Sequence, residues 1–182
     1  MIKKLIHLTE GQKKFLENLP LHKNVLVKPW NHKGIDIASK IIDEIKGIAP
    51  NLEIMLFGSI PLKIAGQDDI DISVFCVKSQ QAKHLSNFRK LFGEPIRMGK
   101  SSIAWEFQKD RFNVSVWLTD PNAETTKAQV KIFTLLKENP KLLREYENIK
   151  VKAKNLSYRE YQRKKYQFYN KILQDKKCNL ST

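Results

Sequence analysis

The feature that most constrains the fold is the segment 69–75, Asp-Ile-Asp-Ile-Ser-Val-Phe, in which polar and apolar residues alternate from Asp69 to Val74. A period of two is typical of a β-strand with one face on a core, because successive side chains point to opposite faces. The apolar side chains would face the core, and the carboxylates of Asp69 and Asp71 would lie side by side on the other face. The segment therefore predicts a strand that presents two neighbouring carboxylates.

The residues before this strand suit a phosphate group. An apolar run at 52–57 ends at Gly58 and Ser59, and a short helix is predicted over 61–65. Glycine lets a backbone turn approach a ligand closely, and Ser59 offers a hydroxyl and a backbone N–H. Two carboxylates on one strand face can share a hard cation such as Mg²⁺, which keeps water or phosphate oxygens as further ligands. The combination indicates phosphate chemistry.

The order Gly-Ser, nine residues, then Asp-Ile-Asp between apolar residues resembles the signature of the DNA polymerase β-like nucleotidyltransferase superfamily. The resemblance implies that Asp69 and Asp71 hold Mg²⁺ or Mn²⁺ on the phosphates of a nucleoside triphosphate, and that Gly58 and Ser59 bind those phosphates. Many members have an arginine in the short helix, where this chain has a leucine followed by Lys63, so Lys63 is the candidate cation. The residues also fit an ordinary turn beside a solvated, acidic strand end.

Residues 101–118 are predicted to form a β-hairpin. Two runs of alternating apolar and polar residues flank a polar stretch that suits a tight turn. A two-residue loop at Lys109 and Asp110 would pair Phe107 with Phe112, and the large apolar side chains would then share one face. With the two strands above, the hairpin predicts a mixed sheet.

The superfamily usually adds a third carboxylate from such a later strand. The resemblance places it at Asn113 or Ser115, and neither is acidic. Glu106 would lie opposite Asn113 in the predicted register, so it is the candidate for the third catalytic carboxylate. The alternative is that Glu106 is an exposed side chain on a hairpin edge.

A second set of motifs narrows the resemblance. The run Leu-Leu-Lys-Glu-Asn-Pro-Lys-Leu-Leu-Arg-Glu-Tyr-Glu-Asn-Ile-Lys at 135–150 and the Val-Lys-Pro-Trp at 27–30 are similar to segments of the GrpB family, a branch of this superfamily. GrpB proteins typically have one aspartate in the strand and a His-x-His motif where this chain has Asn-Val-Ser at 113–115. The doubled aspartate favours a nucleotidyltransferase metal site, whereas the missing histidines remove side chains that would ligate metal or carry protons.

The predicted fold class is α+β, a small mixed sheet of nucleotidyltransferase type with flanking helices. We expect a core with N-terminal helices at 1–121 and a helical extension at 122–182 packed on that core as one structural domain. Helices are predicted where apolar residues recur at helical spacing or caps are present, at 10–19, 35–47, 80–92, 121–137, 140–149 and 158–173.

The charge distribution points to an anionic partner. The formal net charge is +14, and residues 127–182 carry 15 lysines and arginines against 5 acidic residues. Such a surface attracts RNA or another polyanion by a salt-dependent force that is largely independent of sequence. The alternative is a solubilising helical face.

No apolar run approaches the roughly 18 to 20 residues of a membrane-spanning helix, so no membrane partner is expected. The short apolar stretch after the first lysines does not suit a signal peptide. Cys76 and Cys178 belong to no disulfide framework, and the four histidines are scattered, so a zinc site is not predicted and a reducing cytoplasm is the expected location.

Two functions follow from these residues. The first is an enzyme that transfers a nucleotidyl group from a nucleoside triphosphate to an acceptor, with Mg²⁺ on Asp69 and Asp71. The second is a catalytically inactive GrpB-like module that binds a nucleotide, a nucleic acid or another anionic partner. The absence of an acid at Asn113 or Ser115 favours the second function, and the doubled aspartate favours the first.

Overall fold

The computed structural model describes residues 7–20, 22 and 24–178 and forms two compact units. One unit is Lys28–Phe133, and the other combines the described residues up to Val27 with those from Thr134 on. The chain is therefore grouped differently from the predicted division at residue 121, because the N-terminal helix belongs with the C-terminal helices. The packing of the extension on the core stays a prediction.

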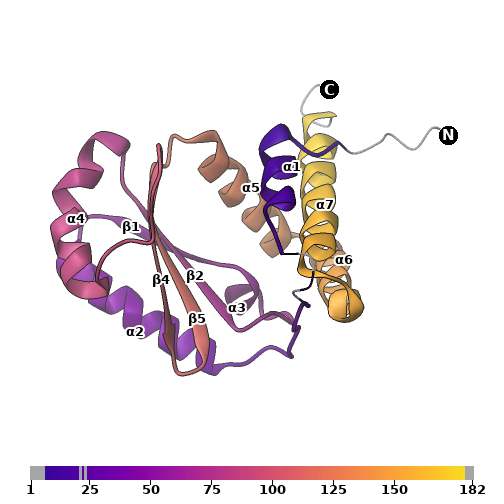
Figure 1. The fold of residues 1–182 in the computed structure, drawn as a ribbon, viewed down its shortest axis with the longest axis horizontal. Helices are drawn as coiled ribbons and strands as arrows, with labels where there is room; N and C mark the ends of the chain where they lie inside the picture. Colours follow the sequence, from indigo (N-terminus) through magenta and orange to yellow (C-terminus); the bar gives the residue numbers. More distant parts are fainter. Residues whose placement is uncertain (1–6, 21, 23, 179–182) are drawn as a thin grey trace. The chain divides into compact units, whose positions relative to one another are not determined.

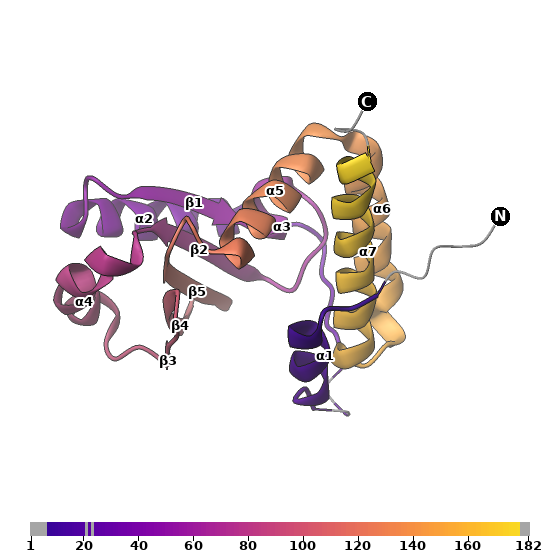
Figure 2. The same ribbon diagram turned by 90° about the horizontal axis from the view of Figure 1, so that it is seen from above.

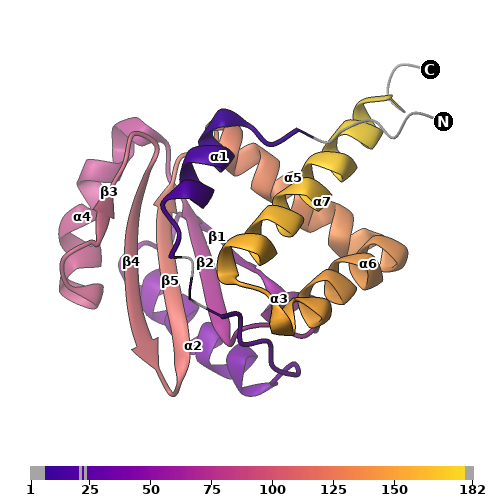
Figure 3. The same cartoon turned by 45° about the vertical axis from the view of Figure 1, so that its right-hand side comes forward.

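The unit Lys28–Phe133 is built on a five-stranded sheet in the order β1-β2-β5-β4-β3. Strands β2 and β5 are parallel, and the other neighbouring pairs are antiparallel, so the sheet is mixed (Figure 3). The predicted α+β class is confirmed. The strands are β1 Glu53–Phe57, β2 Asp69–Phe75, β3 Arg97–Met98, β4 Ser102–Lys109 and β5 Phe112–Thr119.

Two helices, α2 Lys33–Ile48 and α4 Lys78–Phe92, cover one face of this sheet (Figures 1 and 2). Ile70, Ile72 and Val74 of β2 are fully buried against them, as the alternating pattern predicted. This burial supplies the main driving force for the unit, since each buried aliphatic side chain contributes roughly 1.5–3 kcal/mol. The core includes Ile37, Ile41, Ile45, Ile70, Ile72, Val74, Phe88, Trp105, Val114, Val116 and Leu118.

The register of the hairpin β4–β5 differs from the prediction. The loop is Asp110 and Arg111, and Lys109 pairs with Phe112. Both loop residues have positive φ, 48° and 71°, as in the turns whose twist matches that of paired strands. Phe107 therefore pairs with Val114 rather than with Phe112. The pairing moves by two residues, so every side chain keeps its predicted face.

The short helix after the glycine-serine turn also differs in its bounds. Helix α3 spans Ser59–Leu62, whereas the sequence predicted 61–65. It ends at Lys63, whose backbone is left-handed with φ 56°. The turn and the helix are thus continuous, with Ser59 as the first helical residue.

The other unit is helical. Its helix α1 packs on α7, where the side chains of Gln12 and Asn170 exchange hydrogen bonds of 3.1 and 2.9 Å and Arg159 donates to the carbonyls of Glu17 and Leu19 (Figure 1). In the sequence, the division between the two units falls within α5, after Phe133. The side chains of Thr9, Asn139 and Ser157 cap the N-termini of α1, α6 and α7. These elements are α1 Glu10–Glu17, α5 Glu124–Glu138, α6 Pro140–Val151, η1 Lys152–Asn155 and α7 Tyr158–Cys178.

In the part of the chain that the structure describes, no helix is both long and apolar enough to cross a membrane. Cys76 is a buried free thiol. The side chain of Cys178 and residues 1–6, on which the prediction about a leader segment rests, lie outside the described residues.

Candidate active site

The turn between β1 and α3 lies directly against a carboxylate. Gly58 has φ 84° and ψ −158°, a conformation that is essentially restricted to glycine. A Cβ atom at this position would lie 2.9 Å from Asp71 Oδ2. The absence of a side chain at Gly58 therefore lets the backbone of the turn approach Asp71.

Ser59, the other residue of the turn, is positioned by a second glycine. Ser59 is 5% exposed, and a Cβ atom on Gly66 would lie only 2.0 Å from Ser59 Oγ. The hydroxyl group of Ser59 therefore packs against the backbone of Gly66. That backbone is in turn paired with Lys28, through N–H···O bonds of 2.7 and 3.0 Å. Sequence reasoning missed Gly66, because no motif in the neighbouring residues indicates which residue packs on Ser59.

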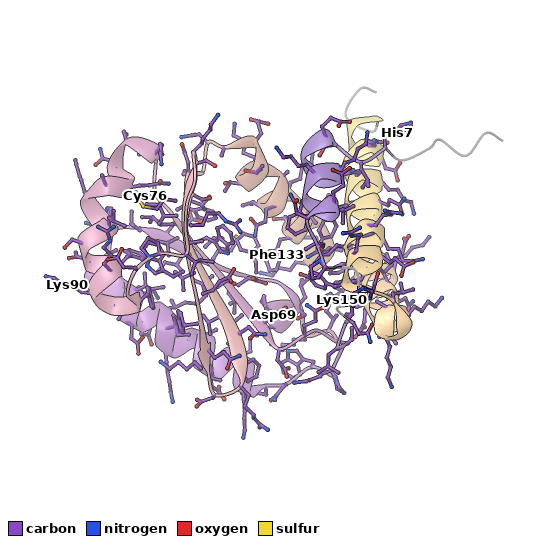
Figure 4. All side chains as sticks on the ribbon, in the orientation of Figure 1. His7, Asp69, Cys76, Lys90, Phe133 and Lys150 are labelled. Carbon is purple, nitrogen blue, oxygen red and sulfur yellow. The ribbon has the colours of Figure 1, made fainter. Side chains whose placement is uncertain are left out.

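Asp69 opens β2, as labelled in Figure 4, and both of its carboxylate oxygens accept amide hydrogen bonds. Asn113 Nδ2 donates to Oδ1 at 3.1 Å, and Gln67 Nε2 donates to Oδ2 at 3.0 Å. Gln108 Nε2 lies 3.4 Å from Asn113 Oδ1, which is a long contact. Neutral amides thus hold the carboxylate of Asp69 in place, and two of these residues, Gln67 and Gln108, were not predicted.

Asp71 lies two residues further along β2 and faces the same side of the sheet, as the alternation predicted. Its cross-strand neighbours are Phe57 on β1 and Ser115 on β5. The two aspartates are the residues that could hold a Mg²⁺ ion, because carboxylate oxygens are its preferred ligands, and the backbone of the turn at Gly58 lies directly beside one of them.

Glu106 shares this face but does not join the aspartates. It pairs with Ser115 rather than with Asn113, which corrects the predicted register. Ser115 separates it from Asp71, so the α-carbons of Glu106 and Asp71 are two strand spacings apart, roughly 10 Å. Among the described residues, no three or more His, Cys, Asp or Glu side chains gather closely enough to hold a metal ion. The described residues thus contain no three-carboxylate cluster that would support a catalytic role for Glu106.

Lys63 lies at the opposite end of α3 from the turn. It is exposed, and none of the ion pairs or side-chain hydrogen bonds found among the described residues involves it. The assignment of Lys63 as a phosphate-binding cation stays a prediction. A different lysine, Lys28, is ion-paired with Asp68 beside the turn, at a distance of 2.6 Å between Nζ and Oδ2.

The unit Lys28–Phe133 is thus an α+β fold in which a glycine-serine turn follows β1 and two aspartates lie on the neighbouring strand β2. The solved structure of the conserved protein GrpB from Enterococcus faecalis superposes with a TM-score of 0.63 at 16% identity, covering 82% of this chain and 98% of that chain. The resemblance to GrpB is confirmed at the level of the fold.

A weaker likeness is to the RNA terminal uridylyl transferase Cid1, with a TM-score of 0.40 and 14% identity over 75% of this chain and 45% of that chain. No protein-family model and no curated protein matches the sequence.

Proposed function

We propose that the chain binds the magnesium complex of a nucleoside triphosphate and transfers its nucleotidyl group to an acceptor hydroxyl. The observation that carries this proposal is the approach of the turn at Gly58 to Asp71, where a Cβ atom would lie 2.9 Å from Oδ2. A phosphate bound on the backbone of that turn and a cation bound on Asp71 would be direct neighbours. This is the arrangement that a metal–triphosphate complex needs.

The chain's own residues would bind and orient the triphosphate. Asp69 and Asp71 would hold Mg²⁺ or Mn²⁺, which neutralises charge on the phosphates when bound. The hydroxyl and N–H of Ser59 would donate to phosphate oxygens, and Gly66 keeps that hydroxyl in place. The oxygen of the acceptor hydroxyl would form a bond to the α-phosphorus as the bond to the leaving pyrophosphate breaks, and the hydroxyl proton would pass to solvent. Positioning and charge neutralisation supply most of the catalysis in such transfers.

A second candidate function is nucleotide binding without transfer. The observation that favours it is the hydrogen bond from Asn113 to Asp69, because an amide stands where a third carboxylate would help to activate the acceptor. Glu106 would have to supply that carboxylate from a more distant strand. Both functions need the same triphosphate site, so binding and turnover have to be measured separately.

An RNA or another polyanion is the proposed partner of the helical unit. Helix α6 and the turn after it present the exposed side chains of Lys141, Arg144, Asn148 and Lys152 along one face, which lines an open hollow of about 470 Å³. The acidic residue in this hollow, Glu145, is already paired with Lys171 at 3.0 Å. The three cations therefore remain available to phosphates, which we propose belong to the acceptor or to a docking partner.

The experiment compares the wild type with Asp71→Asn, which keeps the size of the side chain and removes its charge. Thermal stabilisation is measured with each nucleoside triphosphate, with and without Mg²⁺, because a ligand of the native state raises its stability. Turnover is followed with α-labelled triphosphates in the presence of RNA. Asp43→Asn, which removes an exposed carboxylate from α2, is the matched control.

We expect Mg²⁺-dependent stabilisation by at least one triphosphate in the wild type and the control, and its loss in Asp71→Asn. Label transfer that is also lost in Asp71→Asn would support the enzyme. Binding without transfer to RNA or to the protein would favour the second candidate function. Stabilisation that is unchanged in Asp71→Asn would contradict the site itself.

A further inference from the structure

We propose that Lys28 is a phosphate-binding residue of this site and that Asp68 holds its ammonium group until a triphosphate binds. The inference rests on the proposed function, since it concerns the same triphosphate. It assigns to Lys28 the role that the sequence suggested for Lys63. It also predicts that the site distinguishes a triphosphate from a monophosphate.

The backbone pairing places Lys28 on the correct side of the turn. Lys28 and Gly66 form an antiparallel bridge through two backbone hydrogen bonds. Residues directly opposite each other in such a pair direct their Cβ atoms to the same side. Because a Cβ atom on Gly66 would point at Ser59 Oγ, the side chain of Lys28 leaves the backbone on the side of that hydroxyl.

The segment that carries Lys28 is also fixed to α3. The indole Nε1 of Trp30 donates a 3.0 Å hydrogen bond to the carbonyl of Ile60, in the first turn of α3. Together with the Gly66 bridge, this bond attaches residues 28–30 to both sides of Ser59. Lys28 is therefore held beside the turn by its backbone and does not depend on its ion pair for its position.

The ion pair itself suits an exchange of partners. Lys28 Nζ lies 2.6 Å from Asp68 Oδ2, and the lysine side chain remains 44% exposed whereas that of Asp68 is 15% exposed. A partly exposed ion pair contributes little net stability, so the ammonium can leave Asp68 at small cost. A phosphate oxygen would offer it a charge-assisted hydrogen bond of the stronger kind.

The order of groups along the site indicates which phosphate Lys28 would contact. Asp71 lies against Gly58, Ser59 follows, and Gly66 with Lys28 lies against Ser59. A triphosphate with its metal at Asp71 would extend past Ser59 toward Lys28. Lys28 should therefore contact the phosphate furthest from Asp71, and a monophosphate would be too short to reach it.

The test uses the full chain and measures dissociation constants for the four magnesium nucleoside triphosphates and the matching monophosphates. The variants are Lys28→Met, Lys28→Arg and Lys63→Met, with Lys40→Met on α2 as a control that removes one exposed charge. Circular dichroism and the unfolding midpoint without ligand check that each variant folds. If Lys28→Met unfolds, Lys28→Gln takes its place.

We expect Lys28→Met to weaken triphosphate binding by about tenfold or more, because a charged hydrogen-bond partner is lost, with little change for the monophosphate. Lys28→Arg should retain most of the affinity, and Lys40→Met should match the wild type. A wild type that binds no triphosphate would overturn the proposed function and this inference together. The inference alone fails if the wild type binds and Lys28→Met keeps the same preference for triphosphate, or if only Lys63→Met loses it.

Discussion

The side-chain amide of Asn113 donates a 3.1 Å hydrogen bond to Asp69 Oδ1 across the parallel strands β5 and β2. The two residues are direct partners in the strand register, so their side chains share one face of the sheet. An amide in this position satisfies the carboxylate without adding charge. A carboxylate in the same position would repel Asp69 unless a cation lay between them.

We therefore expect Asn113→Asp to raise the affinity of the site for Mg²⁺ and to destabilise the metal-free protein by about 1 kcal/mol, since a donor is replaced by a like charge at an exposed position. The measurement is the unfolding midpoint as a function of Mg²⁺ concentration. Asn113→Ala is the control, because it loses the hydrogen bond but adds no ligand. Equal Mg²⁺ affinity in Asn113→Asp and Asn113→Ala would argue against a cation between β2 and β5.

Gly66→Ala tests the support of Ser59. The new Cβ atom would lie 2.0 Å from Ser59 Oγ and 2.7 Å from Ser59 Cβ, so the buried serine and its turn must move. We expect a loss of roughly 1–3 kcal/mol in the free energy of unfolding, as for other overpacked sites. Denaturant titration measures this change, and triphosphate binding should weaken with it.

Gly47→Ala is the matched control for that substitution. Gly47 lies in α2, and a Cβ atom there meets nothing within 4 Å. Alanine in a helix is favoured over glycine by roughly 0.5–1 kcal/mol, so this variant should be as stable as the wild type or more stable. A comparable loss of stability at both positions would mean that the contact with Ser59 is not the cause.

Neutralising the basic face of α6 should weaken polyanion binding in a salt-dependent way. A triple variant with glutamine at Lys141, Arg144 and Lys152 removes the three cations that line the hollow. Each cation that contacts a phosphate adds about 1 to the slope of log affinity against log salt, so we expect the slope to fall by up to about 3. Filter binding of single-stranded RNA over a salt series measures the slope.

The control for this variant carries the same loss of charge on the other unit, with glutamine at the exposed residues Lys40, Lys46 and Lys90. If binding depends on the α6 face, the control should keep most of the salt slope. Equal losses in the two variants would show that net charge alone drives the binding.

Cys76 should react slowly with thiol reagents in the folded protein. Its side chain is 3% exposed, and burial together with the negative charge of Asp120 raises the pKa of the thiol above its ordinary value. Since the folded state holds this proton more tightly than the unfolded state, the contribution to stability is complete below the unfolded pKa. It is lost as the pH rises through the raised pKa.

A reagent such as dithiobisnitrobenzoate, applied to a Cys178→Ser background, reports on Cys76 directly. The rate should stay far below that of the unfolded chain near neutral pH and rise in alkaline solution. A rate at neutral pH equal to that of the unfolded protein would contradict the burial of the thiol.

Part of the site could be predicted from sequence because its signals are local. The alternation in β2 identified Asp69 and Asp71 as neighbours on one face, and the glycine-serine pair marked a turn whose geometry only glycine adopts readily. The hairpin was also predicted, but the predicted register was wrong by two residues. The choice between neighbouring two-residue loops depends on small backbone preferences at Asp110 and Arg111 that the residue types do not reveal.

The contacts that sequence reasoning missed join segments that are distant in the chain. Lys28 and Asp68 are 40 positions apart, and Asp69 and Asn113 are 44 apart. No periodicity or short motif encodes such a pair. Gly66 was missed for the same reason, since its importance comes from the hydroxyl that packs on it.

The sequence by itself determined the strand that carries the aspartates, the turn that precedes it, and the basic character of the C-terminal helices, because burial periodicity, glycine conformations and charge are properties of the residues in order. The tertiary structure decided which lysine lies beside the turn and which amides hold Asp69. It also decided that strand β5 lies between Glu106 and the two aspartates. These depend on strand register and on the packing of separate segments, which are set by the free energy of the whole fold.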